Sequence, residues 1–109
     1  MLCVEYRLWN LHDLTDWSTW YNTVTIACQE RSNEQIVERL LGKPIREESM
    51  DRLSYPWVAR YVRSPGKISN VYLYSHMSFR NRGLWYAYVF LDANGDVVGY
   101  RVFTASDFF

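Results

Sequence analysis

The sequence predicts a small α+β domain in which two helices pack on a three- or four-stranded antiparallel sheet. Three observations lead to this class: a capped amphipathic segment from Ser32 to Gly42, alternating apolar residues from position 68 onward, and an Asn94-Gly95 dipeptide between two apolar runs. The 109 residues correspond to a single domain, 1–109, because domains typically hold about 100–150 residues.

The first helix is predicted from apolar residues that recur at helical spacing after Asp13. Asp13 or Thr15 would cap it, because short polar side chains accept hydrogen bonds from the first free backbone amides. Its apolar face comprises Trp17, Trp20, Tyr21, Val24 and Cys28. We interpret this stripe as core, since large aromatic residues of small domains are mostly buried.

The second helix has its own start and stop signals. Ser32 and Gln35 match a capping box, in which each side chain bonds to the backbone amide of the other residue. Gly42 ends the helix, because glycine adopts a left-handed C-terminal cap without steric penalty, and Pro44 prevents continuation. The face predicted to be buried comprises Ile36, Val37, Leu40 and Leu41.

The segments around these helices are assigned from composition. Cys3 to Trp9 is predicted as a short strand or an extended entry, and Ile45 to Ser54 as a charged, irregular surface connection. Trp57 to Arg63 is predicted as a strand, and Ser64 to Lys67 as a turn, because it contains Pro and Gly.

Three longer strands are predicted in the second half of the chain: Ile68 to Phe79, Leu84 to Asp92 and Val97 to Thr104. Asn81 to Gly83 forms the turn between the first two. Alternation places Val71, Leu73 and Ser75 on one face of the first strand, and Tyr72, Tyr74 and His76 on the other.

The Asn94-Gly95 dipeptide predicts a two-residue type I′ hairpin turn, whose twist matches that of the flanking strands. One face of the hairpin would pair Leu91 with Val98, Val89 with Tyr100 and Ala87 with Val102. The opposite face would pair Phe90 with Gly99, Tyr88 with Arg101 and Tyr86 with Phe103. The aliphatic face is expected to pack on the helices, which leaves an aromatic face with one Arg.

Charge and hydropathy exclude several classes of function. Lys plus Arg and Asp plus Glu number 12 each, which argues against a nucleic-acid binder that relies on backbone electrostatics. A modest nucleic-acid surface would use Arg60, Arg63 and Lys67 with Tyr61 and Tyr72. The N-terminus has no signal-peptide pattern and no apolar run reaches about 18 residues, so we expect no membrane span and a cytoplasmic location. A periplasmic or envelope location would follow if the N-terminus has been processed.

Catalysis and metal binding are not predicted. The candidate nucleophiles and ligands are Cys3, Cys28, His12 and His76, and they show none of the close spacings typical of zinc or catalytic sites. Glu47, Glu48 and Asp51 are interpreted as solvated residues of the charged connection. We therefore expect no enzyme activity, no cofactor and no metal. Free buried thiols are the default expectation for Cys3 and Cys28, and one bridge between them is the alternative. A small enzyme with a Cys or His centre is kept as a hypothesis that ranks below the two binding functions given below.

Two motifs carry a family resemblance. The amphipathic helix from Asn33 to Leu40 is followed by Leu41-Gly42-Lys43-Pro44, and the hairpin runs from Tyr88 to Val98. Residues 32–103 thereby resemble the SmpA/BamE-type domain of small bacterial outer-membrane lipoproteins, with its "LGxP" and its "F-D-x-x-G-x-V" ending. The resemblance implies two helices on an antiparallel sheet, a bacterial or phage source, and non-enzymatic protein binding, as in the related β-lactamase-inhibitor fold. The chain lacks the lipidated Cys of that family.

The leading functional prediction is a non-catalytic protein-binding module, of inhibitor or assembly-accessory type, that binds a protein partner or a second copy of itself. Aromatic residues form 17% of the chain, and such residues anchor interfaces. The predicted binding face comprises Tyr72, Tyr74, Tyr86, Tyr88, Phe90, Arg101 and Phe103. The alternative function is a small apolar-ligand binder with an aromatic pocket between helices and sheet. A segment from Trp9 to Tyr21 that covers the aromatic face would make this face core instead.

Overall fold

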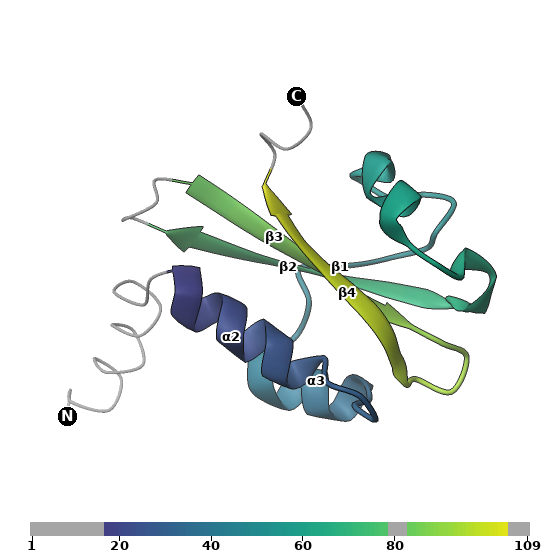
Figure 1. Cartoon of the computed structure of the whole chain (residues 1–109), viewed down its shortest axis with the longest axis horizontal. Coiled ribbons are helices and arrows are strands. Elements are labelled where there is room, and N and C mark those ends of the chain that lie inside the picture. The colour runs from purple at the N-terminus through teal and green to yellow at the C-terminus, as the bar shows by residue number, and fades with distance from the viewer. Residues whose placement is uncertain (1–16, 79–82, 105–109) are drawn as a thin grey trace.

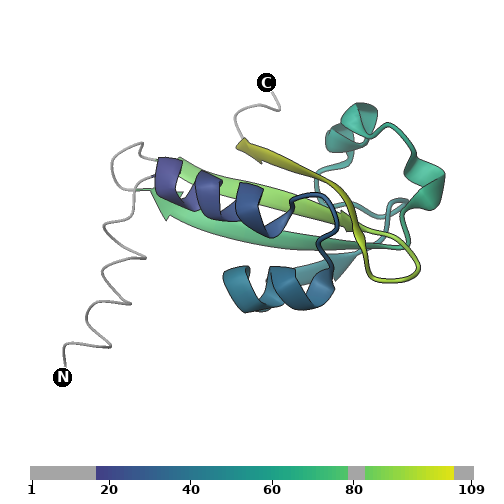
Figure 2. The same cartoon turned by 60° about the horizontal axis from the view of Figure 1, so that its bottom comes forward.

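The computed structural model describes residues 17–78 and 83–104 and shows an α+β fold. Two helices, α2 (Trp17–Ala27) and α3 (Glu34–Leu41), precede a four-stranded antiparallel sheet of order β1-β2-β3-β4. The strands are β1 (Arg46–Glu48), β2 (Asn70–Ser78), β3 (Gly83–Leu91) and β4 (Val97–Thr104). The helices lie on one side of the sheet, and the 3-10 turns η1 (Pro56–Tyr61) and η2 (Pro65–Lys67) lie on the other (Figures 1 and 2). The predicted fold class is therefore confirmed.

The helix side of the sheet holds one hydrophobic core. We name it the helix-side core; it comprises Val24, Ala27, Cys28, Val37, Tyr72, Tyr74, Ala87, Val89 and Leu91. The predicted stripe of the first helix contributes Val24 and Cys28, with Trp20 packed at its edge. The caps proposed for this helix, Asp13 and Thr15, and the strand proposed from Cys3 to Trp9 lie outside the described residues.

Helix α3 begins one residue later than predicted. Its N-cap is Asn33, whose Oδ1 accepts from the backbone amides of Gln35 at 2.9 Å and Ile36 at 3.1 Å. The Ser32 hydroxyl, assigned to the capping box, instead donates to the Ala27 carbonyl in the buried corner between the helices. Gly42 ends the helix with φ of 82°, as its position predicts.

The buried face of α3 also differs from the prediction. Val37 is fully buried, whereas Leu40 is 44% exposed. The cause is Tyr72 beneath the helix, whose hydroxyl donates to the carboxylates of Glu34 at 3.3 Å and Glu38 at 3.0 Å. These contacts turn the helix so that Glu34, Val37, Glu38 and Leu41 face the sheet, because residues three and four apart share one helix face.

The hairpin between β3 and β4 turns over three residues and not over two. The Gly95 amide donates to the Asp92 carbonyl, the Asp92 amide to the Asp96 carbonyl, and only Gly95 takes a positive φ, at 83°. Leu91 consequently pairs with Val97 and not with Val98, so that pairing was predicted wrongly. A bulge at Val98 then restores the predicted pairs from Phe90 with Gly99 to Tyr86 with Phe103.

The extra loop residue has a structural cause in α3. The Glu34 amide donates to the Gly95 carbonyl at 2.8 Å, and the Val97 amide donates to the Ser32 carbonyl at 2.9 Å. The loop therefore docks on the chain that enters the helix, and Asp92 closes it by accepting from the amides of Asn94 and Asp96.

The region from Ile45 to Arg63 was predicted wrongly in two places. Arg46 to Glu48, expected to be irregular, forms the short edge strand β1 against β2. Trp57 to Arg63, expected to be a strand, instead lies mostly in the 3-10 turn η1 (Pro56–Tyr61), because Pro at the first position of the turn has no amide to donate to a sheet. The segment 50–68 thereby crosses the sheet face opposite the helices (Figure 1).

Candidate functional site

The seven residues of the predicted binding face do not share one face. Tyr72 pairs with Val89 and Tyr74 with Ala87, so both tyrosines belong to the helix-side core. The alternation within β2 was predicted correctly, since Val71 and Leu73 pack against the opposite side. The error concerned which faces of β2 and β3 lie on the same side of the sheet, because the turn predicted at Asn81 to Gly83 does not specify a loop length and leaves the register between these two strands open.

The other five residues lie on the opposite face, where most of them are covered. The exposed fractions are 0% for Tyr88, 1% for Phe103 and 4% for Phe90 within a single chain. The ring of Tyr55 lies 4.8 Å from that of Tyr86, and Trp57 meets Phe103 edge-on at 5.4 Å. The centre of the aromatic face is therefore core, which corrects the prediction of an open binding face. The covering segment is 50–68 and not the proposed segment from Trp9 to Tyr21. Residues 17–21 of that proposal belong to α2 on the other side of the sheet, and residues 9–16 lie outside the described residues.

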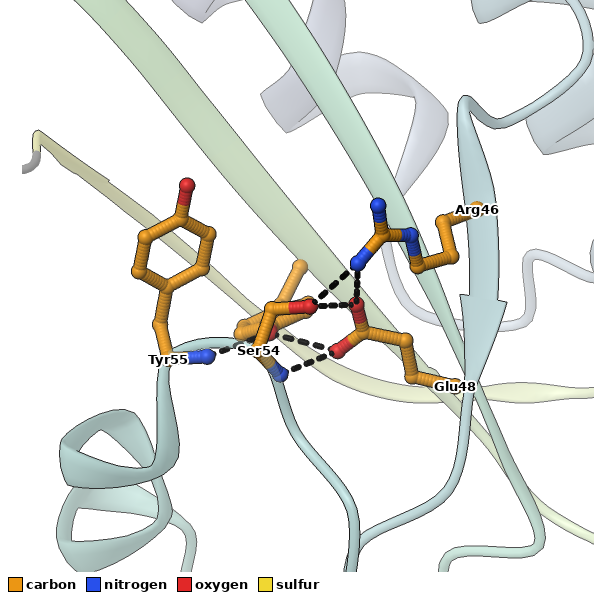
Figure 3. A network of polar contacts seen from close by, with 5 residues as sticks. Arg46, Glu48, Ser54 and Tyr55 are labelled. Atoms are coloured by element: carbon orange, nitrogen blue, oxygen red, sulfur yellow. Dashed lines mark hydrogen bonds and ion pairs between the residues drawn. The ribbon is translucent and has the colours of Figure 1, made fainter.

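A buried carboxylate fixes the start of the covering segment. Glu48 accepts hydrogen bonds from the Tyr88 hydroxyl at 2.7 Å, the Ser54 amide at 2.8 Å and the Ser54 hydroxyl at 2.5 Å (Figure 3). The Arg46 guanidinium donates to the Ser54 hydroxyl and lies 3.8 Å from the Glu48 carboxylate. The Tyr88 oxygen also accepts from the Tyr55 amide at 3.1 Å. These contacts hold the beginning of the segment over the middle of the sheet.

The environment of Glu48 corrects its prediction as a solvated residue, since its side chain is only 3% exposed. Burial alone would raise the pKa of this carboxyl group, but the hydrogen bonds from Ser54 and Tyr88, with Arg46 nearby, outweigh it and lower the pKa below its ordinary value. Burial and the bond to Glu48 raise the pKa of the Tyr88 phenol. Glu47 and Asp51 are exposed, as predicted.

The covering segment leaves a groove of 490 Å³ between itself and β4. We name this space the β4 groove. Its floor is formed by Phe90 and Gly99, which pair across the sheet. Its apolar wall is formed by Val58, Val62 and Ile68 from the covering segment. The groove thus lies beside a glycine in β4, which places no side chain of its own against the Phe90 ring.

The rim of the β4 groove is cationic. Arg63, Lys67 and Arg101 line it, and no acidic residue is among its lining residues. The Arg101 guanidinium stacks on the ring of Tyr61, 4.2 Å from the ring centre. The cluster from Arg60 to Lys67 was noted in the sequence, but Tyr72, assigned to the same surface, lies on the other side of the sheet. Arg101 joins the cluster through the fold.

The groove ends at the outer edge of the sheet. In the part of the chain that the structure describes, β4 pairs with β3 on one side and has no strand on the other. Val98, pushed out by the bulge, is 47% exposed beside the groove. Alternate backbone groups of an antiparallel edge strand point away from its partner and remain available for pairing.

Of the four candidates for chemistry, the structure describes Cys28 and His76. Cys28 is buried in the helix-side core, and burial raises the pKa of its thiol to about 12. His76 stacks on Trp20 with ring centroids 5.1 Å apart, while Cys3 and His12 lie outside the described residues. Within residues 17–78 and 83–104, no group of three His, Cys, Asp or Glu could hold a metal ion. None of the described helices is long and apolar enough to cross a membrane.

Comparisons of the chain with protein-family models, with curated proteins and with solved structures find no match. The resemblance to SmpA/BamE-type domains therefore stays a prediction from the sequence motifs.

Proposed function

We propose that the protein is a non-catalytic protein-binding module and that its binding surface is the β4 groove with the adjoining edge of β4. The observation that carries this proposal is the groove itself, which joins an apolar floor and a cationic rim to a strand edge that no other described strand pairs with. Strand edges and aromatic-lined grooves are two common surfaces for binding extended peptides.

This surface replaces the broad aromatic face as the site. Of the residues predicted from the sequence, Phe90 and Arg101 line the groove. Arg is enriched among the residues that dominate binding energy at interfaces, and Arg101 is already oriented by Tyr61. The other predicted aromatics support the sheet from within the two cores.

A small-ligand binder is the second candidate, favoured by the volume of the groove. Small-molecule sites span about 300–1,000 Å³, and the β4 groove falls in this range at 490 Å³. The predicted location between helices and sheet does not support it, because Tyr72 and Tyr74 fill that layer. Such a ligand would bind in the β4 groove and would be anionic as well as apolar.

The inhibitor or assembly role, the bacterial or phage source and the cytoplasmic or envelope location belong to the same proposal. The role, the source and the envelope location rest on the SmpA/BamE resemblance, with which the two-helix, antiparallel arrangement agrees, whereas the cytoplasmic location rests on the sequence pattern alone. Agreement of folds is an argument by analogy, because one fold serves many functions.

Site-specific photocrosslinking in the host cell tests the proposal. A benzophenone amino acid at Val98 reports on the groove, and one at Ile26, exposed on α2, is the matched control. We expect protein adducts at Val98 that Arg101→Glu abolishes, and no such adducts at Ile26. Identical adducts at both positions, or adducts indifferent to Arg101→Glu, would contradict protein binding at this surface.

A further inference from the structure

We propose that the partner enters the β4 groove as an extended acidic segment, which pairs with the backbone of β4 and places one apolar side chain over Gly99. This inference rests on the proposed function and gives it a ligand chemistry.

The acidic character follows from charge. The groove presents Arg63, Lys67 and Arg101 with no carboxylate, although the whole chain has as many acidic as basic residues. Within the described residues, none of these three side chains takes part in an ion pair. Their positive charges therefore remain available to a partner, and complementary potentials determine which partners associate.

The extended conformation follows from the edge of β4. From Gly99 to Thr104 the strand keeps regular pairing with β3, since the bulge is confined to Val98 beside the turn. A regular edge offers amide and carbonyl groups at the spacing of another strand, which a helix cannot match.

The apolar anchor follows from Gly99. A methyl group built at Gly99 would meet the Phe90 ring at 3.8 Å, an ordinary contact distance, and nothing else within 4 Å. The position thus has room beside an aromatic ring, in a groove whose wall is Val58, Val62 and Ile68. An aliphatic or aromatic side chain of the partner fits this place and would be the centre of the binding energy.

The same distances supply a blocking variant. Gly99 does not take a positive φ, so a larger residue adopts its backbone conformation without strain. Gly99→Leu places a side chain where the partner's anchor would lie. Arg101→Glu is the second variant, at an exposed position, and Arg39→Glu, at an exposed position of α3, is the matched charge control.

The experiment is selection of a displayed library of random short peptides on the immobilised full chain. We expect enriched peptides to be acidic with one conserved apolar residue, and to lose at least about tenfold in affinity for Gly99→Leu and Arg101→Glu, but not for Arg39→Glu. N-methylation of alternate peptide amides should abolish binding for one alternating set and spare the other, because only one set faces β4. Thermal unfolding of each variant verifies that it is folded. If Gly99→Leu does not fold, the affinity of the peptides for Arg101→Glu tests the proposal.

Several results would overturn the inference: neutral or basic selected peptides, affinity indifferent to Gly99→Leu and Arg101→Glu, equal tolerance of both N-methylated sets, or no binder at all. If an oligothymidylate bound more tightly than the selected peptides, the cationic side chains of the groove would be a nucleic-acid-binding surface instead. If these results came with partner adducts at Val98, the proposed protein-binding function would still hold, and only the inference that the partner binds as an extended acidic segment would be rejected. If the Val98 adducts were also absent, the proposed function and the inference about the acidic segment would both be rejected.

Discussion

The Tyr88 hydroxyl donates a 2.7 Å hydrogen bond to the carboxylate of Glu48, which lies forty residues earlier in the chain. Tyr88 stands fully buried in the middle of β3, and Glu48 ends the edge strand β1. This bond, with the Ser54 contacts, determines where the segment 50–68 crosses the sheet. Because that segment forms one wall of the β4 groove, the buried pair sets the shape of the proposed site.

Tyr88→Phe should destabilise the protein by about 1–3 kcal/mol, because it removes one donor to the buried Glu48 and the acceptor of the Tyr55 amide. Urea unfolding measures the change. Tyr61→Phe is the control, since Tyr61 is half exposed and its ring still supports Arg101. Equal stability of wild type and Tyr88→Phe would show that the network does not secure the segment.

Stability should fall on acidification because of Glu48. Its pKa is lowered in the folded protein, so its stabilisation is present above the unfolded pKa of about 4.3 and is lost as pH falls through the folded value. Glu48→Gln cannot ionise, so its melting temperature should depend less on pH below about 4.3 than that of the wild type. Parallel melting curves against pH for the two proteins would rule out this linkage.

Substitutions in α3 should follow the observed face and not the apolar pattern. Val37→Ala should cost about 1–3 kcal/mol, since the side chain is fully buried. Leu40→Ala should cost less than about 1 kcal/mol, because nearly half of that side chain is in water. Thermal denaturation of both variants checks the order, and a larger loss for Leu40→Ala would reverse our orientation of the helix.

Gly95→Val should destabilise the hairpin by about 1 kcal/mol or more, since φ is 83° there and a β-branched residue resists it. Its Cβ would also approach the Glu34 carboxylate to 3.2 Å. Gly66→Ala is the control, because nothing lies within 4 Å of its added methyl and its φ is not positive. Similar melting temperatures for Gly95→Val and Gly66→Ala would argue against the observed turn.

The elements that the sequence predicted well are those with strong local signals. Gly42 ends α3 as expected, and the pairs from Phe90–Gly99 to Tyr86–Phe103 hold. They hold through two departures that cancel, since the three-residue loop shifts the register by one and the bulge at Val98 shifts it back. Local propensity favoured a two-residue turn, whereas hydrogen bonds to the distant entry of α3 favoured three: the Glu34 amide donates to the Gly95 carbonyl, and the Val97 amide donates to the Ser32 carbonyl.

The features that sequence reasoning missed depend on contacts between distant segments. Glu48 looked like one charge of an exposed run, because nothing nearby in the sequence shows that Tyr88 reaches it. The β4 groove likewise brings Arg63 and Lys67 of the covering segment close to Gly99 and Arg101 of β4. The sequence signals for the groove were the basic cluster after η1 and a glycine opposite Phe90. Neither signal indicates a groove unless the position of the covering segment on the sheet is known.

The central claim is tested most directly by amide hydrogen exchange of the wild-type protein, measured in β4 with and without the partner that the Val98 crosslinks identify. We expect the partner to slow exchange in residues 98–104 and around Arg63 and Lys67, and to leave α3 unchanged, because binding pairs the β4 edge and fills the groove. Protection confined to α3 or β1, with β4 unaffected, would contradict the claim that this protein binds its partner at the β4 groove.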